Sequence, residues 1–400
     1  MTTLLIDDDP FALTLLSRQL NELGCTGLTL CERAQDALAL LEAGEQRIEL
    51  VFCDLQMPDM DGVQFVRHLA RIGYRGSLVL VSGEDARVLQ TVHRLAQAHQ
   101  IHMLGAVSKP VSPAHLARLL AAHAARGSDV ARTAARPQPP DELQAALANG
   151  EMLNHYQPKV AFASGALVGV EALVRWQHPR HGLLYPDHFV STAEEHTLID
   201  GLTRVVLGNA LRQARTWQGQ GLDLQVSVNV SMDNLAALDF PDVVAQLAHD
   251  AGVALPNLVL EVTESRLMKD VRAPLDILTR LRLKRIGLSI DDFGTGHSSL
   301  AQLRDIPFDE LKLDRSFVHG AAADTSLAAI VEGTLAMARH LGIKTVAEGV
   351  EDRADWDFMR TLGCDLAQGY FVARPMPGNE LPHWQTGWEQ RRAALMTAAR

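Results

Sequence analysis

The chain has 400 residues, of which 47% are hydrophobic and 21% are charged, and this balance at this length favours two globular domains. Its formal net charge of −11 argues against the broad basic surface that binding to a nucleic-acid duplex requires. Neither a basic start with an apolar stretch of ~7–15 residues nor an apolar run of ~20 residues occurs. We therefore expect a soluble, cytoplasmic protein that does not enter a membrane.

Short apolar segments alternate with amphipathic ones across residues 1–125. The segments at 4–6, 50–53 and 78–81 are apolar throughout, which is typical of strands in a parallel sheet covered on both faces. Helix-like segments at 11–23 and 34–41 separate them. The pattern predicts a doubly wound, flavodoxin-like α/β domain.

Polar residues stand at the carboxyl ends of these predicted strands. They are Asp7, Asp8, Asp54, Ser82 and Lys109. In a doubly wound sheet these ends form one crevice. Carboxylates there can hold Mg²⁺, a carboxylate can accept a phosphoryl group, and a hydroxyl with an ammonium can bind the phosphate.

This ordered set resembles the response-regulator receiver domain across residues 1–123. The resemblance implies that Asp54 accepts the phosphoryl group and that Asp7 and Asp8 hold Mg²⁺ with it. Ser82 and Lys109 would then sense the phosphate. A sensor histidine kinase or a phosphotransfer protein is the implied partner.

One position departs from the receiver pattern. Members usually carry an aromatic residue three positions before the lysine, where this chain has Ala106. We expect phosphorylation to act by a different route, or less through a side-chain switch than through loop and interface changes.

Residues 126–140 contain Pro137, Pro139 and Pro140 and few apolar side chains, which predicts a linker. Beyond it, residues 141–390 hold strand candidates with helix-like segments between them. The candidates lie at 155–160, 167–173, 225–230, 258–262, 285–290, 310–313, 344–347 and 365–371. Eight such units in about 250 residues predict one TIM-like (β/α)8 barrel.

Acidic and amide side chains recur at or near the ends of these strands. They are Glu171, Asn229, Glu261, Glu264, Asp291, Asp292, Asp314, Glu348 and Glu351, with Lys312 among them. A charged side chain inside a strand is costly unless it is paired or metal-bound. One acid at a strand end is ordinary, but strand ends of a barrel converge on one mouth, so the recurrence predicts a site there.

Carboxylates with one amide oxygen, and neither Cys nor His, suit Mg²⁺ or Mn²⁺ better than zinc. Their surplus over the needs of one ion suggests two ions, an arrangement that suits phosphate-ester hydrolysis. Lys312 could orient or deprotonate the attacking water, or offset developing charge. His178 and His181 resemble a metal pair, but they stand in a Pro-Arg turn and are interpreted as surface residues.

Together the motifs of this half resemble the EAL phosphodiesterases across nearly all of residues 141–380. The matching motifs are Tyr156-Gln157-Pro158-Lys159, Glu171-Ala172-Leu173-Val174-Arg175-Trp176, Val228-Asn229-Val230-Ser231, Glu261-Val262-Thr263-Glu264-Ser265, Asp291-Asp292-Phe293-Gly294-Thr295-Gly296, Lys312-Leu313-Asp314, Ala347-Glu348-Gly349-Val350-Glu351 and Gln368-Gly369-Tyr370. The resemblance implies metal-dependent hydrolysis of cyclic di-GMP to linear pGpG.

The resemblance also assigns roles. It implies that Glu171, Asn229, Glu261 and Asp291 bind a first ion, and that Asp291 and Asp292 bind a second. Lys312, Glu348 and Glu171 are the expected catalytic residues. Gln157, Arg175, Asp314 and Gln368 are expected to hold the substrate. Glu264 would brace the loop at 292–299, in which His297 replaces a common tyrosine and is expected to tune the loop without abolishing activity.

Two other functions compete with this prediction. A catalytically silent cyclic di-GMP receptor would signal through protein contacts, but the complete ligand set and Lys312 weigh against it. A receiver-driven transcription factor lacks support because no helix-turn-helix pattern is present and the chain is acidic. We also expect a homo-oligomer.

Overall fold

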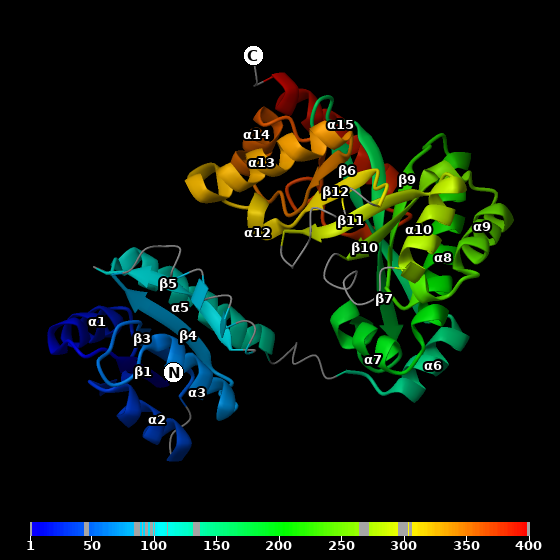
Figure 1. The fold of residues 1–400 in the computed structure, drawn as a ribbon. Coiled ribbons are helices and arrows are strands. Elements are labelled where there is room, and N and C mark those ends of the chain that lie inside the picture. Colours follow the sequence, from blue (N-terminus) through cyan, green and yellow to red (C-terminus); the bar gives the residue numbers. More distant parts are fainter. Residues whose placement is uncertain are drawn as a thin grey trace. The chain divides into compact units, whose positions relative to one another are not determined.

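The computed structural model describes residues 2–43, 48–83, 101–109, 111–130, 137–263, 272–294 and 306–397, with further positions at 89, 91, 92, 95, 96, 99 and 303. It divides into two compact units, Met1–Ala134 and Ala135–Arg400, and each is described by itself (Figure 1). Helix α5 (Pro113–Val130) ends the described part of the first unit. The linker limits of 126–140 stay a prediction.

The first unit contains a five-stranded parallel sheet. Its strands are β1 (Thr2–Ile6), β2 (Gly27–Cys31), β3 (Leu50–Asp54), β4 (Ser77–Ser82) and β5 (His102–Ser108), in the order β2-β1-β3-β4-β5. Helices α1 (Pro10–Glu22), α2 (Ala34–Ala43), α3 (Gly62–Arg71) and α5 accompany them. Two apolar clusters, one on each side of the sheet, confirm the predicted doubly wound fold.

The second unit is a closed barrel. Among the described residues, its ring consists of β6 (Met152–Ala161), β7 (Leu167–His178), β9 (Gln225–Val230), β10 (Leu258–Thr263), β11 (Gly287–Phe293), β12 (Glu310–Leu313), β13 (Lys344–Ala347) and β14 (Leu366–Ala367). Strand β6 closes the ring by pairing with both β7 and β14. Short strands β8 (Gly182–Leu184) and β15 (Met376–Pro377) pair with β7 and β6. The predicted TIM-like barrel is confirmed.

The first barrel strand differs from the regular pattern, because β6 runs antiparallel to both of its neighbours. Only residues 162–166 connect it to β7. A parallel crossover needs about a dozen residues or more, so this connection permits only a hairpin. The pairing sets Gln157 opposite Glu171, in the middle of the two strands.

Helices surround the strands of this unit (Figure 1). They are α6 (Pro140–Asn149), α7 (Val190–Glu195), α8 (Ile199–Gly219), α9 (Phe240–Ala251), α10 (Arg272–Leu283), α12 (Arg315–Val318), α13 (Thr325–Leu341), α14 (Arg353–Thr361) and α15 (Leu381–Thr397). Within the described ranges, none is long and apolar enough to cross a bilayer.

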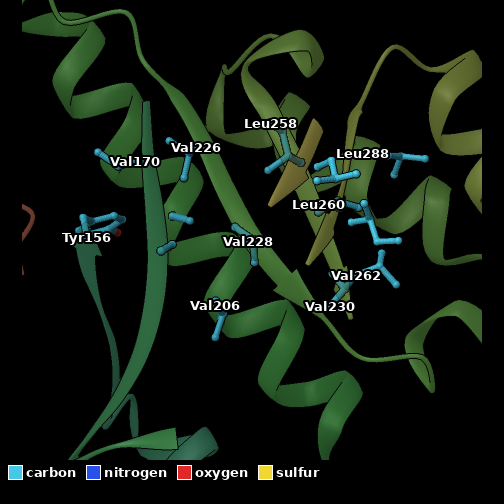
Figure 2. Packing of buried hydrophobic residues seen from close by; sticks show 14 of the residues in the cluster. Tyr156, Val170, Val206, Val226, Val228, Val230, Leu258, Leu260, Val262 and Leu288 are labelled. Atoms are coloured by element: carbon cyan, nitrogen blue, oxygen red, sulfur yellow. The ribbon is translucent and has the colours of Figure 1, made fainter. Parts of the chain in front are cut away.

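Side-chain alternation along the strands decides which residues face the helices. On β9, Val226, Val228 and Val230 are buried in the apolar core, and Figure 2 shows them beside the corresponding residues of β10. Successive side chains of a strand point to opposite faces. Ser227 and Asn229 therefore point into the barrel, where the polar residues gather.

Candidate active site

The polar residues inside the barrel form two layers. The upper layer, nearest the carboxyl ends of the parallel strands, contains Gln157, Glu171, Asn229, Glu261, Asp291 and Lys312. The lower layer contains Lys159, Ser227, Ser289 and Glu310, each two residues from an upper-layer residue of the same strand. A spacing of two places both members on one face of a strand.

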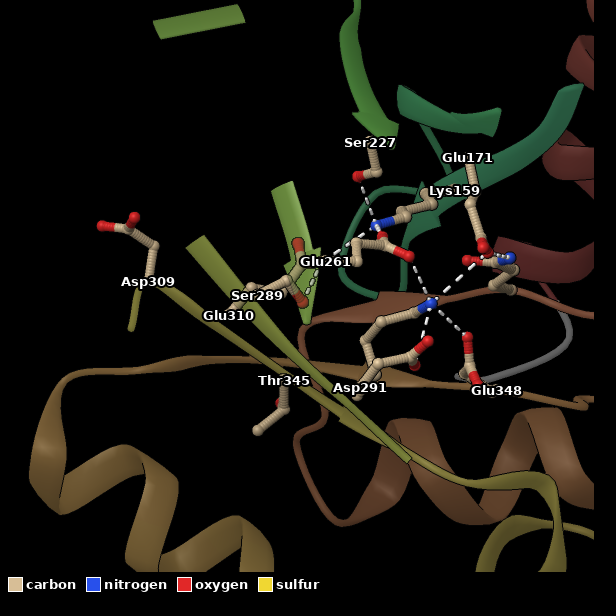
Figure 3. Close-up of polar contacts among 12 residues, drawn as sticks. Lys159, Glu171, Ser227, Glu261, Ser289, Asp291, Asp309, Glu310, Thr345 and Glu348 are labelled. Atoms are coloured by element: carbon tan, nitrogen blue, oxygen red, sulfur yellow. Dashed lines mark hydrogen bonds and ion pairs between the residues drawn. The ribbon is translucent and has the colours of Figure 1, made fainter. Parts of the chain in front are cut away.

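Lys312 is the centre of the upper layer, with 1% of its side chain exposed. Its Nζ lies 2.7 Å from Glu261 Oε2, 2.7 Å from Glu348 Oε1, 3.1 Å from Asp291 Oδ1 and 3.4 Å from Glu171 Oε2. Figure 3 shows these four carboxylates turned toward one point. Burial alone would lower the pKa of Lys312, but the surrounding carboxylates raise it well above its usual value.

A chain of amide hydrogen bonds fixes Glu171. Asn229 Nδ2 donates to Glu171 Oε1 at 2.7 Å, and Gln368 Nε2 donates to Glu171 Oε2 at 2.5 Å. Gln368 Nε2 also donates to Gln157 Oε1 at 3.1 Å, and Gln157 Nε2 donates to Ala373 O at 3.1 Å. The structure thus brings four of the predicted site residues into one network.

This site holds more negative than positive charge. Burial and the nearby Asp291 raise the pKa of Glu348 to about 8 in spite of Lys312. Burial and Glu261 likewise raise the pKa of Glu171. Carboxylate oxygens of Asp291, Asp292 and Glu348 lie within 4.8 Å of one another. A divalent cation would offset this excess, and an all-oxygen donor set fits Mg²⁺ or Mn²⁺.

A pocket of about 290 Å³ opens over these groups, and Glu171, Asp291, Lys312 and Gln368 line it. Arg175 and Asp314 are not among the described residues that line this pocket. Arg175 donates to Val174 O at 2.8 Å and lies 4.7 Å from the Tyr185 ring. Asp314 caps α12 by accepting from Ser316 N at 2.9 Å. The substrate roles of both residues stay predictions.

Part of the predicted site lies outside the described residues. Glu264 is there, as are His297 and the rest of the loop after Gly294. Asp292, just before it, has a left-handed backbone with φ of 54°. This is an uncommon conformation for a residue other than glycine, and it occurs within the acidic cluster of Asp291, Asp292 and Glu348.

One sequence interpretation is wrong. His178 is buried, with Nε2 3.1 Å from Glu142 Oε2 on α6, and its Nδ1 accepts the backbone N–H of Arg180 at 3.0 Å. It ties α6 to the turn after β7, whereas His181 is exposed. The turn signal was correct, but it did not reveal that α6 covers this strand end.

In the first unit, the predicted phosphorylation residues lie together. Carboxylate oxygens of Asp7, Asp8 and Asp54 are within 4.8 Å of one another. Lys109 Nζ lies 2.7 Å from Asp7 Oδ2 and 2.8 Å from Asp54 Oδ2. Burial lowers the pKa of Lys109, but its bonds to the two aspartates raise it overall. The buried Ser82 accepts, through its backbone O, from Lys109 N at 2.9 Å.

Comparison with known proteins gives a matching result for each unit. A family model described as "EAL domain" matches residues 141–375. The chain belongs to the EAL domain family. A second model, "Response regulator receiver domain", matches residues 3–121. The doubly wound unit is accordingly a receiver domain.

Curated relatives share one or both domains. Cyclic di-GMP phosphodiesterase RocR of Pseudomonas aeruginosa is 33% identical over 380 residues, covering 94% of this chain and 96% of RocR. The bifunctional diguanylate cyclase/cyclic di-GMP phosphodiesterase MucR of the same organism is 44% identical over 241 residues, covering 60% of this chain and 35% of MucR. The match to RocR thus includes both domains.

Solved structures match the EAL domain. The structure entitled "PaMucR Phosphodiesterase, c-di-GMP complex" is 43% identical, with a TM-score of 0.58, and covers 60% of this chain and 98% of that one. The EAL domain of Xanthomonas citri FimX in complex with c-diGMP is 26% identical, with a TM-score of 0.56, and covers 59% and 92%.

The lower polar layer of the EAL domain has no role predicted from the sequence. Lys159, Ser227 and Glu310 stand among apolar strand residues, and a single polar residue in a strand is a weak signal. A usable signal exists, because each lies two positions from a predicted site residue: Gln157, Asn229 and Lys312. Because residues two positions apart in a strand share a face, this spacing indicates that Lys159, Ser227 and Glu310 point into the barrel as the site residues do.

Proposed function

We propose that this chain is a metal-dependent phosphodiesterase that hydrolyses cyclic di-GMP to linear pGpG. The arrangement of Lys312 among four carboxylates, beneath an open pocket, is the observation that carries the proposal. The printed names of RocR and of the MucR complex support the choice of substrate.

The proposed metal ligands follow from the donor atoms. Glu171, Asn229, Glu261 and Asp291 would hold one Mg²⁺ or Mn²⁺, and Asp291 with Asp292 would hold a second. Since Asn229 donates through Nδ2 to Glu171, its Oδ1 is the atom suited to a cation. Bound there, such ions supply Lewis-acid stabilisation of a phosphoryl oxygen and lower the pKa of water.

The protein groups have complementary tasks. Lys312 would orient the attacking water. As the oxygen of that water bonds to phosphorus and the phosphorus–O3′ bond breaks, Lys312 would also stabilise the negative charge that develops on the phosphoryl group. Glu348, whose Oε1 lies 2.7 Å from Lys312 Nζ, would accept the proton of that water in its ionised form, and the departing 3′ oxygen would take a proton from solvent. Gln157 and Gln368 would hold the substrate from the pocket wall, with Arg175 and Asp314 as outer contacts.

We further propose that the receiver controls this activity. Asp54 would accept a phosphoryl group from a sensor histidine kinase or a phosphotransfer protein, with Mg²⁺ held by Asp7, Asp8 and Asp54. Lys109 already contacts Asp54 and would pair with the phosphoryl oxygens, as would Ser82.

Incubation of the full chain with cyclic di-GMP and Mg²⁺, with and without acetyl phosphate, tests the proposal. Chromatography and mass spectrometry should identify pGpG as the product. Glu171→Gln is the control, because it removes one carboxylate charge and should abolish turnover. Tight binding of cyclic di-GMP without any product would instead identify a silent receptor.

A further inference from the structure

Lys159 lies below the active site, in the lower polar layer, with 3% of its side chain exposed. Its Nζ donates to Ser227 Oγ at 2.8 Å, to Glu261 Oε1 at 2.8 Å and to Glu310 Oε1 at 2.9 Å. These three partners use all three donors of an ammonium group. Ser289 Oγ donates to the same Glu310 oxygen at 3.1 Å, so Glu310 is held as well (Figure 3).

Glu261 therefore joins the two layers. Its Oε1 accepts from Lys159 below, while its Oε2 accepts from Lys312 above at 2.7 Å. Burial alone would raise the pKa of Glu261, but the two lysines lower it to about 2. The carboxylate is thus held in one rotation, with Oε2 alone turned toward the other acids.

None of the four lower-layer residues lines the pocket above Lys312. Among the described contacts, Lys159 therefore touches the upper layer through Glu261, which is the residue it can orient directly. Ion pairs buried this deeply are seldom a source of net stability, so a specific orientation of a functional group is the more economical reason for one.

We propose that Lys159 is a positioning residue that fixes Glu261 as a single-oxygen ligand of the first metal ion. The inference rests on the proposed function, because it assumes that Glu261 binds the ion. Groups that orient metal ligands from behind commonly change metal affinity by about 10–100-fold when they are removed.

The decisive variant is Lys159→Met combined with Glu310→Gln, in the full chain. Lys159→Met alone leaves the buried Glu310 without a counter-charge and makes the barrel interior more negative, which attracts cations and endangers folding. The double variant removes one positive and one negative charge, so the net charge of the barrel interior is unchanged. What it removes is the ammonium that orients Glu261. Glu310→Gln alone is the matched control, because Lys159 keeps Glu261 and Ser227.

Mn²⁺ binding to the metal-free proteins should be measured by calorimetry and electron paramagnetic resonance, alongside the thermal midpoint. We expect the double variant to bind Mn²⁺ about 10-fold more weakly or worse, while the control stays near wild type. The Mg²⁺ concentration for half-maximal turnover should rise in parallel, with much of the rate recovered at saturating Mg²⁺.

The outcomes separate the two claims. A folded double variant with wild-type Mn²⁺ affinity overturns the role of Lys159, even when turnover falls. An equal loss of affinity in Glu310→Gln overturns it too, because the loss then follows Glu310. Wild-type protein that binds Mn²⁺ but leaves cyclic di-GMP intact overturns the proposed function, whereas a weaker affinity of the double variant still supports the positioning of Glu261.

Discussion

Lys312 and Lys159 show how two chemically identical residues take different tasks from their positions. Both are buried and both contact Glu261. Lys312 lines the pocket, and the negative charge of the carboxylates around it is larger than its own positive charge. Lys159 lies below the pocket, and all three of its N–H donors are used in hydrogen bonds. Access to the pocket, rather than residue type, distinguishes the proposed catalytic lysine from the proposed positioning one.

Replacing Lys312 by methionine should lower kcat by about 10²–10⁴-fold, the usual contribution of a group that activates or orients water. In metal-free protein it should also cost about 3 kcal/mol of stability, because buried carboxylates lose their counter-charge. Steady-state kinetics and thermal unfolding with and without Mg²⁺ measure both effects. The exposed Lys344 supplies the control variant Lys344→Met. A wild-type kcat in Lys312→Met would rule out its catalytic role.

Calcium should inhibit turnover. Ca²⁺ binds oxygen at about 2.3–2.6 Å with loose geometry, whereas Mg²⁺ requires about 2.0–2.1 Å and an octahedron. A site whose Glu171 and Glu261 are held by fixed hydrogen bonds cannot adapt its ligands to both ions. Rates measured at constant Mg²⁺ and rising Ca²⁺ should fall, and added Mg²⁺ should restore them. Activity unaffected by excess Ca²⁺ contradicts the metal-site assignment.

At the scale of elements, the sequence predicted both folds and the strands that carry the site. The apolar run Leu258–Val262 is interrupted only by Glu261, and acidic residues recur near the ends of the other barrel strands. Three features escaped prediction. The first is the hairpin of β6, although the short gap at 162–166 is a signal that could have revealed it. The other two are the lower layer and the burial of His178. Both depend on contacts between distant segments, such as the contact of Glu142 with His178.

The segment between β13 and α14 should make stability depend on pH. Asp355 accepts from His319 at 2.9 Å and from the backbone N–H of Glu351 at 3.0 Å, so this pair holds the segment that follows Glu348. The hydrogen bond to Asp355 raises the pKa of His319 above 6.5. Its stabilisation is therefore complete below that unfolded-state value and is lost as pH rises through the folded-state pKa.

Thermal unfolding of wild type and His319→Gln across this range gives the test. The wild type should be the more stable protein near pH ~5.5, and the difference should shrink toward pH ~9. The exposed His340 on α13 provides the control His340→Gln, which should leave the pH profile unchanged. A difference between wild type and His319→Gln that does not vary with pH would contradict the role of this pair.

At the scale of the whole molecule, one chain joins a receiver domain, with its proposed phosphoryl-accepting site, to an EAL domain. Lys109 contacts Asp54, and α5 begins only four residues later, at Pro113. Any change at Lys109 on phosphorylation therefore has a short covalent route into α5, the last described helix of the receiver domain in chain order. Ala106, which is half-buried against apolar neighbours, offers no large ring to move, so backbone and interface changes are the expected carrier.

Asp54→Asn separates the two halves of this arrangement. Acetyl phosphate should add one phosphoryl group to the wild-type chain, detected by intact-mass spectrometry, and should change its turnover of cyclic di-GMP. The substituted amide keeps the size of the side chain but lacks the nucleophilic carboxylate, so neither effect should occur, while turnover without acetyl phosphate persists. Asp36→Asn, at an exposed acid on α2, is the matched control and should behave as wild type. A labelled Asp54→Asn protein would place the acceptor elsewhere, and a labelled wild type with unchanged turnover would show that the receiver does not control the hydrolytic site.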